Sequence, residues 1–220
     1  MKEDTITNNT ITNKWLNRAF ILSLITIFYN LVEGGIATFF GSQDETLALF
    51  GFGVDSFVEV LSGIGIAHMV VRMKKNPIES RDHFEVTALK ITGTAFYLLV
   101  VGLIIGAGLS IYYQSNPETT LVGMIISIIS ILTMYILYKQ KLKAGKELSS
   151  EPIISDANCT RTCFYLSFIL LGSSTLYELF KIPYVDAIGS LGIAWYAFKE
   201  GKEAFEKAKT KQLSCTDNCC

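Results

Sequence analysis

The sequence predicts an all-α polytopic membrane protein with six transmembrane helices and both termini in the cytoplasm. Half of its 220 residues are hydrophobic and only 18% are charged, whereas a soluble domain of this size carries about 25% charged residues. The apolar residues also fill whole segments instead of marking one face of each segment. Such filled segments are typical of chains that span a lipid bilayer.

Six apolar segments are long enough to cross a bilayer, which takes about 20 residues at a rise of about 1.5 Å per residue. They cover approximately residues 15–41, 46–72, 84–113, 120–138, 153–180 and 184–205. The sixth continues into the charged, amphipathic stretch FKEGKEAFEKAKTK, which we expect to leave the membrane. We therefore divide the chain into a polar N-terminus (1–14), a six-helix transmembrane domain (15–208) and a cysteine-containing tail (209–220).

Basic residues are distributed unevenly over the connections, and their distribution predicts the orientation. The connections GSQDET, QSNPET and KIP hold one lysine between them. Basic residues are retained on the cytoplasmic side, so both termini are predicted to be cytoplasmic, with the protein in the cell (inner) membrane. The basic residues gather before the first segment (Lys14, Arg18), after the second (Arg72, Lys74, Lys75, Arg81), after the fourth (Lys139, Lys141, Lys143, Lys146) and towards the end (Lys199, Lys202, Lys207, Lys209, Lys211).

Two of the predicted helices carry acids or thiols on one face. In the second segment, FGFGVDSFVEVLSG places Asp55 and Glu59 four residues apart, about one helical turn. In the fifth, SDANCTRTCFYL places Asp156, Cys159 and Cys163 at spacings of three and four residues. An acid at the centre of a span costs roughly 2.5 to 3.5 kcal/mol on insertion scales. Paired acids in a span therefore favour a functional role over packing.

The depths of these side chains agree between the two antiparallel segments. At about 1.5 Å per residue, Asp55 and Glu59 lie roughly 13 and 19 Å from the outer face, and Cys163 and Cys159 roughly 15 and 21 Å. Cysteines in a span are by themselves more often small packing residues, but the shared depth favours ligands. Two carboxylates and two thiolates predict a four-ligand site for zinc or a softer ion.

Arg161 lies off the cysteine face of the fifth segment. A cation there needs a partner or access to water. Three arrangements are open: an ion pair with Asp156, an ion pair with Glu33, or a side chain that extends to the cytoplasmic interface.

The tail ends in CTDNCC, which contains Cys215, Cys219 and Cys220. In a reducing cytosol these thiols are not expected to form disulfides. They are either a metal-loading point that passes ions by thiolate exchange or part of a disordered end, and the sequence leaves both readings open.

The polar residues of the spans resemble those of the cation diffusion facilitator (cation efflux) family, the proton-coupled metal exporters with six spans and both termini inside. DSFVE resembles the His/Asp-xxx-Asp pair of span two in that family, with Asp55 and Glu59 at the ligand positions. DANCTRTC resembles the Asp-xx-His-xxx-Asp pattern of span five, with Asp156 leading and Cys159 and Cys163 at the His and Asp positions. The resemblance implies a transported metal ion held between spans two and five.

Three further stretches extend the resemblance over nearly all of residues 15–208. YNLVEGG, with Asn30 and Glu33, resembles the polar part of span one, so these two residues and Asp156 are candidate accessory groups. NPIESRDHFEVTALKITG is similar to the loop that leads into span three, and VDAIGSLGIAWYAFKEG to the opening of span six.

Two departures from the family pattern alter what the resemblance implies. The C-terminal cytoplasmic domain of the family is not expected in this chain. A homodimer is therefore a candidate assembly, but it would lack the contact that this domain provides in the family. Thiolates in place of His and Asp shift the preference towards Zn²⁺, Cd²⁺, Hg²⁺ or Cu⁺ and away from Mg²⁺ and Mn²⁺. No prosthetic group is expected beyond the transported ion.

Charge balance predicts the mechanism. Four ionised ligands would place four negative charges in a low-dielectric slab, so the empty site is expected to carry protons that an incoming metal expels. We expect export by metal/proton antiport with alternating access. A metal importer and a non-transporting membrane sensor or partner subunit are the alternatives.

The remaining function classes find no support in the sequence. The sequence shows neither a nucleophile with a neighbouring base nor a phosphate-binding loop, so it gives no indication of an enzyme. The expected partners are the lipid bilayer, metal ions and protons, without nucleic acid.

Overall fold

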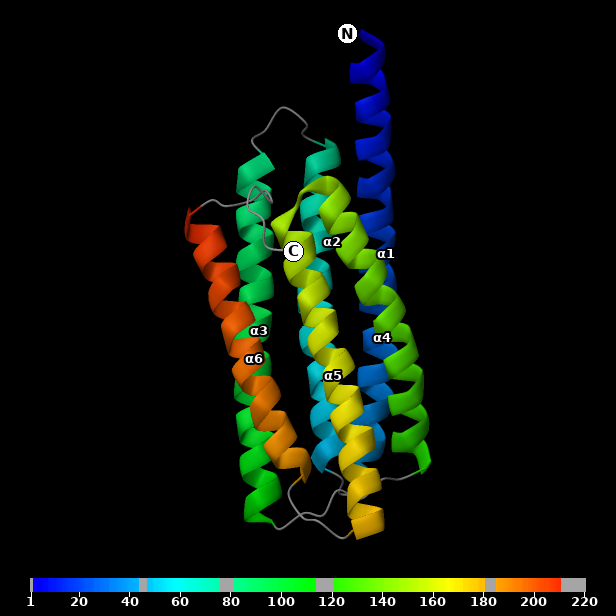
Figure 1. The fold of residues 1–220 in the computed structure, drawn as a ribbon, viewed down its shortest axis with the longest axis vertical. Coiled ribbons are helices and arrows are strands. Elements are labelled where there is room, and N and C mark those ends of the chain that lie inside the picture. Colours follow the sequence, from blue (N-terminus) through cyan, green and yellow to red (C-terminus); the bar gives the residue numbers. More distant parts are fainter. Residues whose placement is uncertain (1, 44–46, 76–80, 114–120, 181–184, 211–220) are drawn as a thin grey trace.

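The computed structural model describes residues 2–43, 47–75, 81–113, 121–180 and 185–210, and within these residues the fold is built from six α-helices (Figure 1). All-helical architecture and the number of helices agree with the prediction from sequence. The helices are α1 (Lys2–Gln43), α2 (Leu47–Lys75), α3 (Arg81–Tyr112), α4 (Leu121–Leu148), α5 (Glu151–Phe180) and α6 (Val185–Thr210).

Successive helices run in opposite directions, so that the start of α1 and the end of α6 lie at the same end of the bundle (Figure 1). The closest pairings along the bundle are α1 with α2, α3 with α6, and α4 with α5. Helix α2 also packs against α3 and α5, and α5 also packs against α3 and α6. Helices α2 and α5 therefore meet inside the bundle, where their polar side chains face each other.

Among the described residues, four helical stretches are long and apolar enough to cross a membrane by length and composition. This criterion covers only the described residues, and the side chains in parts of α5 and α6 are not among them, so the spans that the sequence predicts there stay predictions. The four stretches are Thr12–Ser42, Leu49–Lys75, His83–Tyr112 and Gly123–Leu148.

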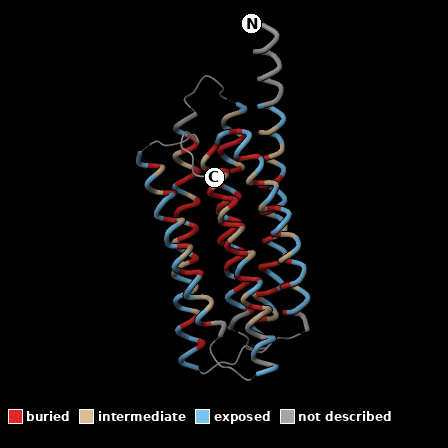
Figure 2. The backbone as a smooth tube through the Cα atoms, in the orientation of Figure 1, coloured by how far each residue is buried: buried red, intermediate tan, exposed pale blue. Residues whose placement is uncertain are grey.

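Figure 2 shows buried residues facing the centre of the bundle and exposed residues facing outward. Large apolar side chains are exposed on its outer faces, including Phe28 (74% exposed) and Trp195 (68%). By contrast, Asn30, Glu59 and Asp156 are buried. An ionisable side chain in such an interior is costly unless it finds a partner there. The positions of these partners determine the candidate site.

Helix α4 extends ten residues past the predicted end at residue 138, up to Leu148. The sequence assigned Lys139, Lys141 and Lys143 to a connection, and this assignment is wrong, since all three are helical. Lysine, leucine, alanine and glutamate are good helix formers, so the helix continues after the apolar run stops. It ends at Leu148, and the next residue, Ser149, has a φ of 46°. Ser149 and Ser150 alone connect α4 to α5.

Helices α1 and α2 cross at two glycines, Gly34 and Gly53. A Cβ atom on Gly53 would lie 2.6 Å from the backbone nitrogen of Thr38 and 3.0 Å from the carbonyl oxygen of Gly34. Backbone atoms cannot give way as a flexible side chain can. The absence of a side chain at Gly53 therefore allows α1 and α2 to approach closely and positions α2.

We expect Gly53→Ala to destabilise the folded protein by about 1 to 3 kcal/mol, because the added methyl group overpacks the α1–α2 crossing. Gly51→Ala is the matched control on the same helix, since a Cβ there meets no atom within 4 Å; it gains up to about 1 kcal/mol of helix propensity. Thermal unfolding in detergent measures both changes. Equal melting temperatures for the two variants would contradict the close crossing.

Candidate metal centre

Helix α2 brings Asp55 and Glu59 into the interior of the bundle. They are separated by four residues and so lie on one face of the helix, about one turn apart. Asp55 is 3% exposed and Glu59 is fully buried. Apolar residues of the same helix, Leu49, Phe52 and Ile66, are also buried, so α2 packs with this mixed face inward. Both acids therefore face the interior of the bundle.

Helix α5 brings Asp156, Cys159 and Cys163 into the same interior. All three are buried, and both cysteines are free thiols. The Cys163 thiol lies beside the Asp55 carboxylate, and Glu59 and Cys159 are its other titratable neighbours. Cys159 has Glu59 and Asp156 as neighbours. The two acids of α2 and the two thiols of α5 are thus neighbours along the α2–α5 contact, and their role as ligands stays a prediction.

A buried lysine of α4 also lies within this region. Lys141 is 1% exposed, with its Nζ 2.9 Å from Asp156 Oδ2 and 3.6 Å from Glu59 Oε1. The sequence placed Lys141 in a cytoplasmic connection, because basic residues after an apolar segment usually mark its flank. The ion pairs explain the difference, since an ammonium group can be buried where carboxylates of two neighbouring helices surround it.

One sequence signal would have located Lys141. It continues the apolar stripe of α4 that faces the core, at helical spacing between Leu137 and Ala144, while Lys139 and Lys143 are exposed. A lysine within the apolar stripe indicates a buried cation, whereas the lysines beside it, outside the stripe, indicate the exposed end of a span.

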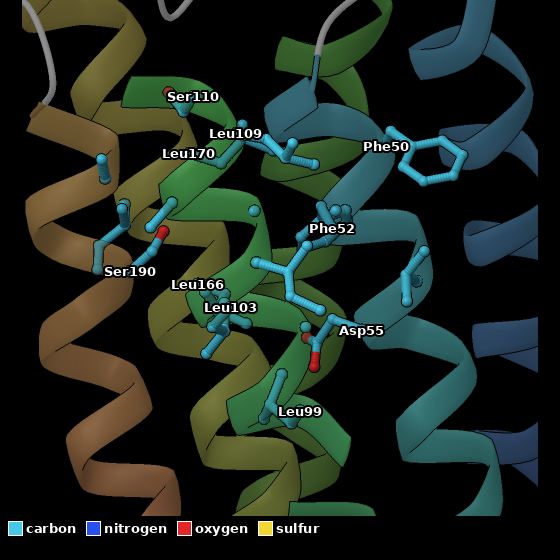
Figure 3. Close-up of a pocket in the computed structure, with 18 of the residues that line it drawn as sticks. Phe50, Phe52, Asp55, Leu99, Leu103, Leu109, Ser110, Leu166, Leu170 and Ser190 are labelled. Carbon is cyan, nitrogen blue, oxygen red and sulfur yellow. The ribbon is translucent and has the colours of Figure 1, made fainter. Parts of the chain in front are cut away.

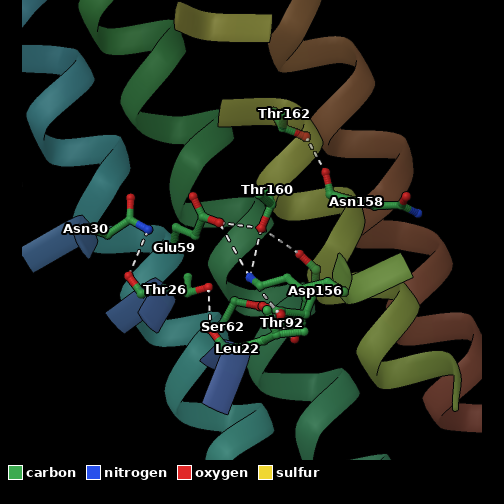
Figure 4. Close-up of polar contacts among 11 residues, drawn as sticks. Leu22, Thr26, Asn30, Glu59, Ser62, Thr92, Asp156, Asn158, Thr160 and Thr162 are labelled. Carbon is green, nitrogen blue, oxygen red and sulfur yellow. Dashed lines mark hydrogen bonds and ion pairs between the residues drawn. The ribbon is translucent and has the colours of Figure 1, made fainter. Parts of the chain in front are cut away.

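Hydroxyl groups complete the network around this lysine (Figure 4). Lys141 Nζ donates to Thr160 Oγ1 at 2.8 Å, and Thr160 Oγ1 in turn donates to Glu59 Oε1. On the other side Ser62 Oγ donates to Asp156 Oδ1 at 2.6 Å and lies 3.1 Å from Thr92 Oγ1. Asp156 thus accepts from both Lys141 and Ser62.

Three carboxylate oxygens of the site lack such partners. Both Asp55 oxygens and Glu59 Oε2 are buried without a hydrogen bond from the protein. In the part of the chain that the structure describes, no three His, Cys, Asp or Glu side chains converge closely enough to hold a metal ion. Glu59 instead directs Oε1 towards Thr160 and Lys141.

The accessory residues Asn30 and Glu33 lie where α1 packs against α2. Glu33 accepts from Tyr29 Oη at 2.8 Å and from Ser56 Oγ at 3.2 Å. Asn30 Nδ2 donates to the Thr26 carbonyl at 3.0 Å, while its Oδ1 is buried without a partner. Both side chains are thus held mainly by α1 itself and by Ser56, so they line the α1–α2 contact near the acids of α2.

Arg161 is not paired with Asp156 or Glu33, the two partners considered from sequence. Its guanidinium lies 3.5 Å from Glu200 Oε1 on α6 and stacks over the rings of Tyr138 and Tyr196. Asp156 is already paired with Lys141, and Arg161 projects from another face of α5. It therefore joins α5 to α6 and stays outside the cluster of acids and thiols.

A cavity of about 240 Å³ reaches Asp55 from the end of the bundle opposite to the start of α1 (Figures 1 and 3). Its walls come from α2, α3, α5 and α6 and are largely apolar, with Ser110 and Ser190 as polar groups besides Asp55. Figure 3 shows Phe50 and Ser110 near one end of the cavity and Asp55 further inside. The cavity therefore extends along α2 and α3 from Phe50 and Ser110 to the Asp55 carboxylate.

The tail cysteines Cys215, Cys219 and Cys220 lie outside the described residues. Both readings of the tail, as a loading point or as a disordered end, therefore stay as the sequence left them.

The sequence matches one known protein family, described as the cation efflux transmembrane domain, over residues 19–209. This range begins within α1 and ends within α6, so the match covers most of the bundle, including both helices of the candidate centre.

Two curated relatives are similar along most of this chain. The manganese efflux system protein MneP of Bacillus subtilis is 27% identical over 197 residues, covering 83% of this chain and 64% of the relative. The uncharacterized transporter MJ0449 of Methanocaldococcus jannaschii is 26% identical over 176 residues, covering 78% and 62%. The chain thus spans less than two thirds of the length of either relative.

The burial of Cys159 and Cys163 predicts that a bulky maleimide will not modify them in the folded protein. The test uses a background in which Cys215, Cys219 and Cys220 are serine, so that the two buried thiols are the remaining ones. Mass spectrometry should detect modification only after denaturation. Tyr113→Cys, at an exposed position, is the positive control, and modification of the native thiols at the rate of this control would contradict their burial.

Proposed function

Because the chain belongs to the cation efflux transmembrane domain family, we propose that it exports a divalent or soft heavy-metal cation from the cytoplasm. Asp55 and Glu59 of α2 and Cys159 and Cys163 of α5 are the proposed ligands. The observation that carries the proposal is the meeting of these two acids and two thiols inside an otherwise apolar bundle. Uncompensated acids are too costly in a membrane interior to persist as packing residues.

Two sulfur donors favour Zn²⁺, Cd²⁺, Hg²⁺ or Cu⁺ as the exported ion. Soft thiolates prefer these ions, while Mn²⁺ prefers carboxylate, carbonyl and water oxygens. One relative is named for manganese efflux, so manganese belongs in any comparison of ions. Because two of the four proposed donor atoms are sulfur, Mn²⁺ should be a poorer substrate than these softer ions.

The unpaired oxygens support a site that gains partners when the ion arrives. Asp55 has two buried oxygens without a protein partner and Glu59 has one, and a metal ion would satisfy all three. The ion would first require Glu59 to turn away from Thr160 and Lys141, because Oε1 is engaged there. Binding would also require the two thiols to lose their protons.

The two sides of the site differ, and this difference favours alternating access. The cavity leads to Asp55 from the end opposite to the start of α1. Towards the end where α1 starts, the Lys141, Thr160 and Ser62 network closes the same site. With the termini cytoplasmic, the cavity would lie on the outer side of the site, and the ion would be released there. Protons displaced at loading and regained after release would give metal/proton antiport.

Cells that lack their own exporters provide the direct test. Expression of this chain should lower the cell content of zinc, cadmium, mercury or copper and raise resistance, and should change manganese content less. Element analysis across a panel of Zn, Cd, Hg, Cu, Co and Mn measures this. A raised metal content would indicate import instead, and unchanged content for every ion would favour a sensor or partner subunit.

Proteoliposomes with the purified chain serve as the control for proton coupling. An imposed pH gradient should drive metal transport, and metal transport should dissipate such a gradient. Metal movement that neither uses nor consumes the gradient would refute antiport while leaving metal transport intact.

Variants of the proposed ligands test the site itself. Asp55→Asn should weaken metal binding at least about tenfold, because it removes an anionic oxygen ligand. Cys159→Ser combined with Cys163→Ser should abolish the thiolate-to-metal absorbance of bound Cd²⁺. Glu206→Gln is a matched control, since this acid is exposed. Retained cadmium absorbance in the double variant would show that the cysteines only pack the core.

A further inference from the structure

We propose that Lys141 is a tethered cation that competes with the transported metal ion for Glu59. This inference rests on the proposed metal site and adds a residue that limits its affinity. The proposal starts from a geometric fact: the ammonium group of Lys141 lies 3.6 Å from Glu59 Oε1 and 2.9 Å from Asp156 Oδ2, with 1% of the residue exposed.

Lys141 and a metal ion bound to Glu59 would be neighbours of like charge. The ammonium group lies beside the same carboxylate that the ion would use, and both side chains are buried, so the repulsion is weakly screened. Glu59 Oε1 is also fixed by the hydroxyl of Thr160, which itself accepts from Lys141. The ion can therefore occupy Glu59 fully only when Lys141 moves away from it.

Asp156 provides the place to which Lys141 withdraws. The shorter contact of the ammonium group is already with Asp156, and Ser62 holds the other oxygen of this carboxylate at 2.6 Å. A shift of Lys141 towards Asp156 would free Glu59 without leaving the ammonium group unpaired. Lys141 thus remains charged and paired in both states, and only its distance from Glu59 changes.

This arrangement predicts a function for the lysine beyond packing. A buried ion pair stabilises a fold no better, in many cases, than well-packed apolar residues of similar volume, so packing alone gives little reason for a lysine in the apolar stripe of α4. A tethered cation lowers the affinity for the metal, because part of the binding free energy is used to displace it. A weaker site releases its ion more readily after the transporter opens.

The test measures Cd²⁺ binding to the purified full chain in detergent, by titration calorimetry and by the increase of melting temperature that Cd²⁺ produces. Lys141→Met should bind Cd²⁺ about tenfold more tightly than the natural protein. Its melting temperature without metal should fall, while the increase on adding Cd²⁺ should become larger. Lys141→Arg, which retains a cation, should bind Cd²⁺ as the natural protein does.

Lys139→Met is the matched control, because this neighbouring lysine of α4 is exposed and lies over the Tyr135 ring. Its Cd²⁺ affinity should not change. A folded Lys141→Met variant with unchanged or weakened affinity would overturn the proposal, since a merely structural lysine would lower stability without tightening metal binding.

Thr160→Val keeps the proposal testable if Lys141→Met does not fold. Removal of this hydroxyl loosens both Lys141 and Glu59 Oε1, so Cd²⁺ should bind about threefold more tightly. Unchanged or weaker binding would count against the tethered cation. Asp55→Asn separates the two ideas: if it leaves Cd²⁺ binding intact, the proposed metal site fails, whereas a loss of binding there with no effect at Lys141 and Thr160 refutes the tethered cation alone.

Discussion

The contact of Lys141 with two carboxylates joins three helices inside the bundle. Its ammonium group comes from α4, Glu59 from α2 and Asp156 from α5. Each of these groups would be costly alone in an apolar interior, so the packing of the three helices and the burial of their charges depend on each other. The polar hydroxyls of Ser62 and Thr160 are positioned around this contact and complete it.

The contact also divides the interior into two parts with different chemistry. Towards the start of α1 the carboxylates have a cation and hydroxyl donors. Towards the opposite end Asp55 has neither, and it lies beside the Cys163 thiol and a largely apolar cavity. Along this line of polar residues, the carboxylates of one half thus have ion-pair and hydrogen-bond partners, whereas Asp55 in the other half has none of these.

Much of this arrangement follows from the sequence alone. The spacing of Asp55 and Glu59, and that of Cys159 and Cys163, predicts one face on each helix, and the depth of the two spans predicts that these faces meet. In the structure all four side chains are buried at the α2–α5 contact, and their role as one ligand set stays a prediction. Helix number and the all-helical fold were equally predictable, because long apolar segments in a bilayer have little choice but to satisfy their backbone as helices.

The partners of the charges were not predictable in the same way. Lys141 resembles the flanking lysines on either side of it in composition, and only its place in the apolar stripe of α4 distinguishes it. The sequence left Arg161 to pair with Asp156 or Glu33 or to extend to the cytoplasmic interface, whereas in the structure it pairs with Glu200 of α6. This pairing depends on how α5 and α6 face each other. Side-chain pairing between helices requires their relative rotation, and hydropathy does not encode this rotation.

The two-residue link at Ser149 and Ser150 has a consequence for how the protein enters a membrane. It makes α4 and α5 a helical hairpin, so Lys141 and Asp156 are near neighbours along the chain and can meet before the other helices are in place. Helix α5 carries Asp156 and Arg161 in its first half, and each is costly alone in lipid. If α4 and α5 insert together as a hairpin, Asp156 enters the lipid already paired with Lys141. The two helices would then insert as one unit and not one after the other.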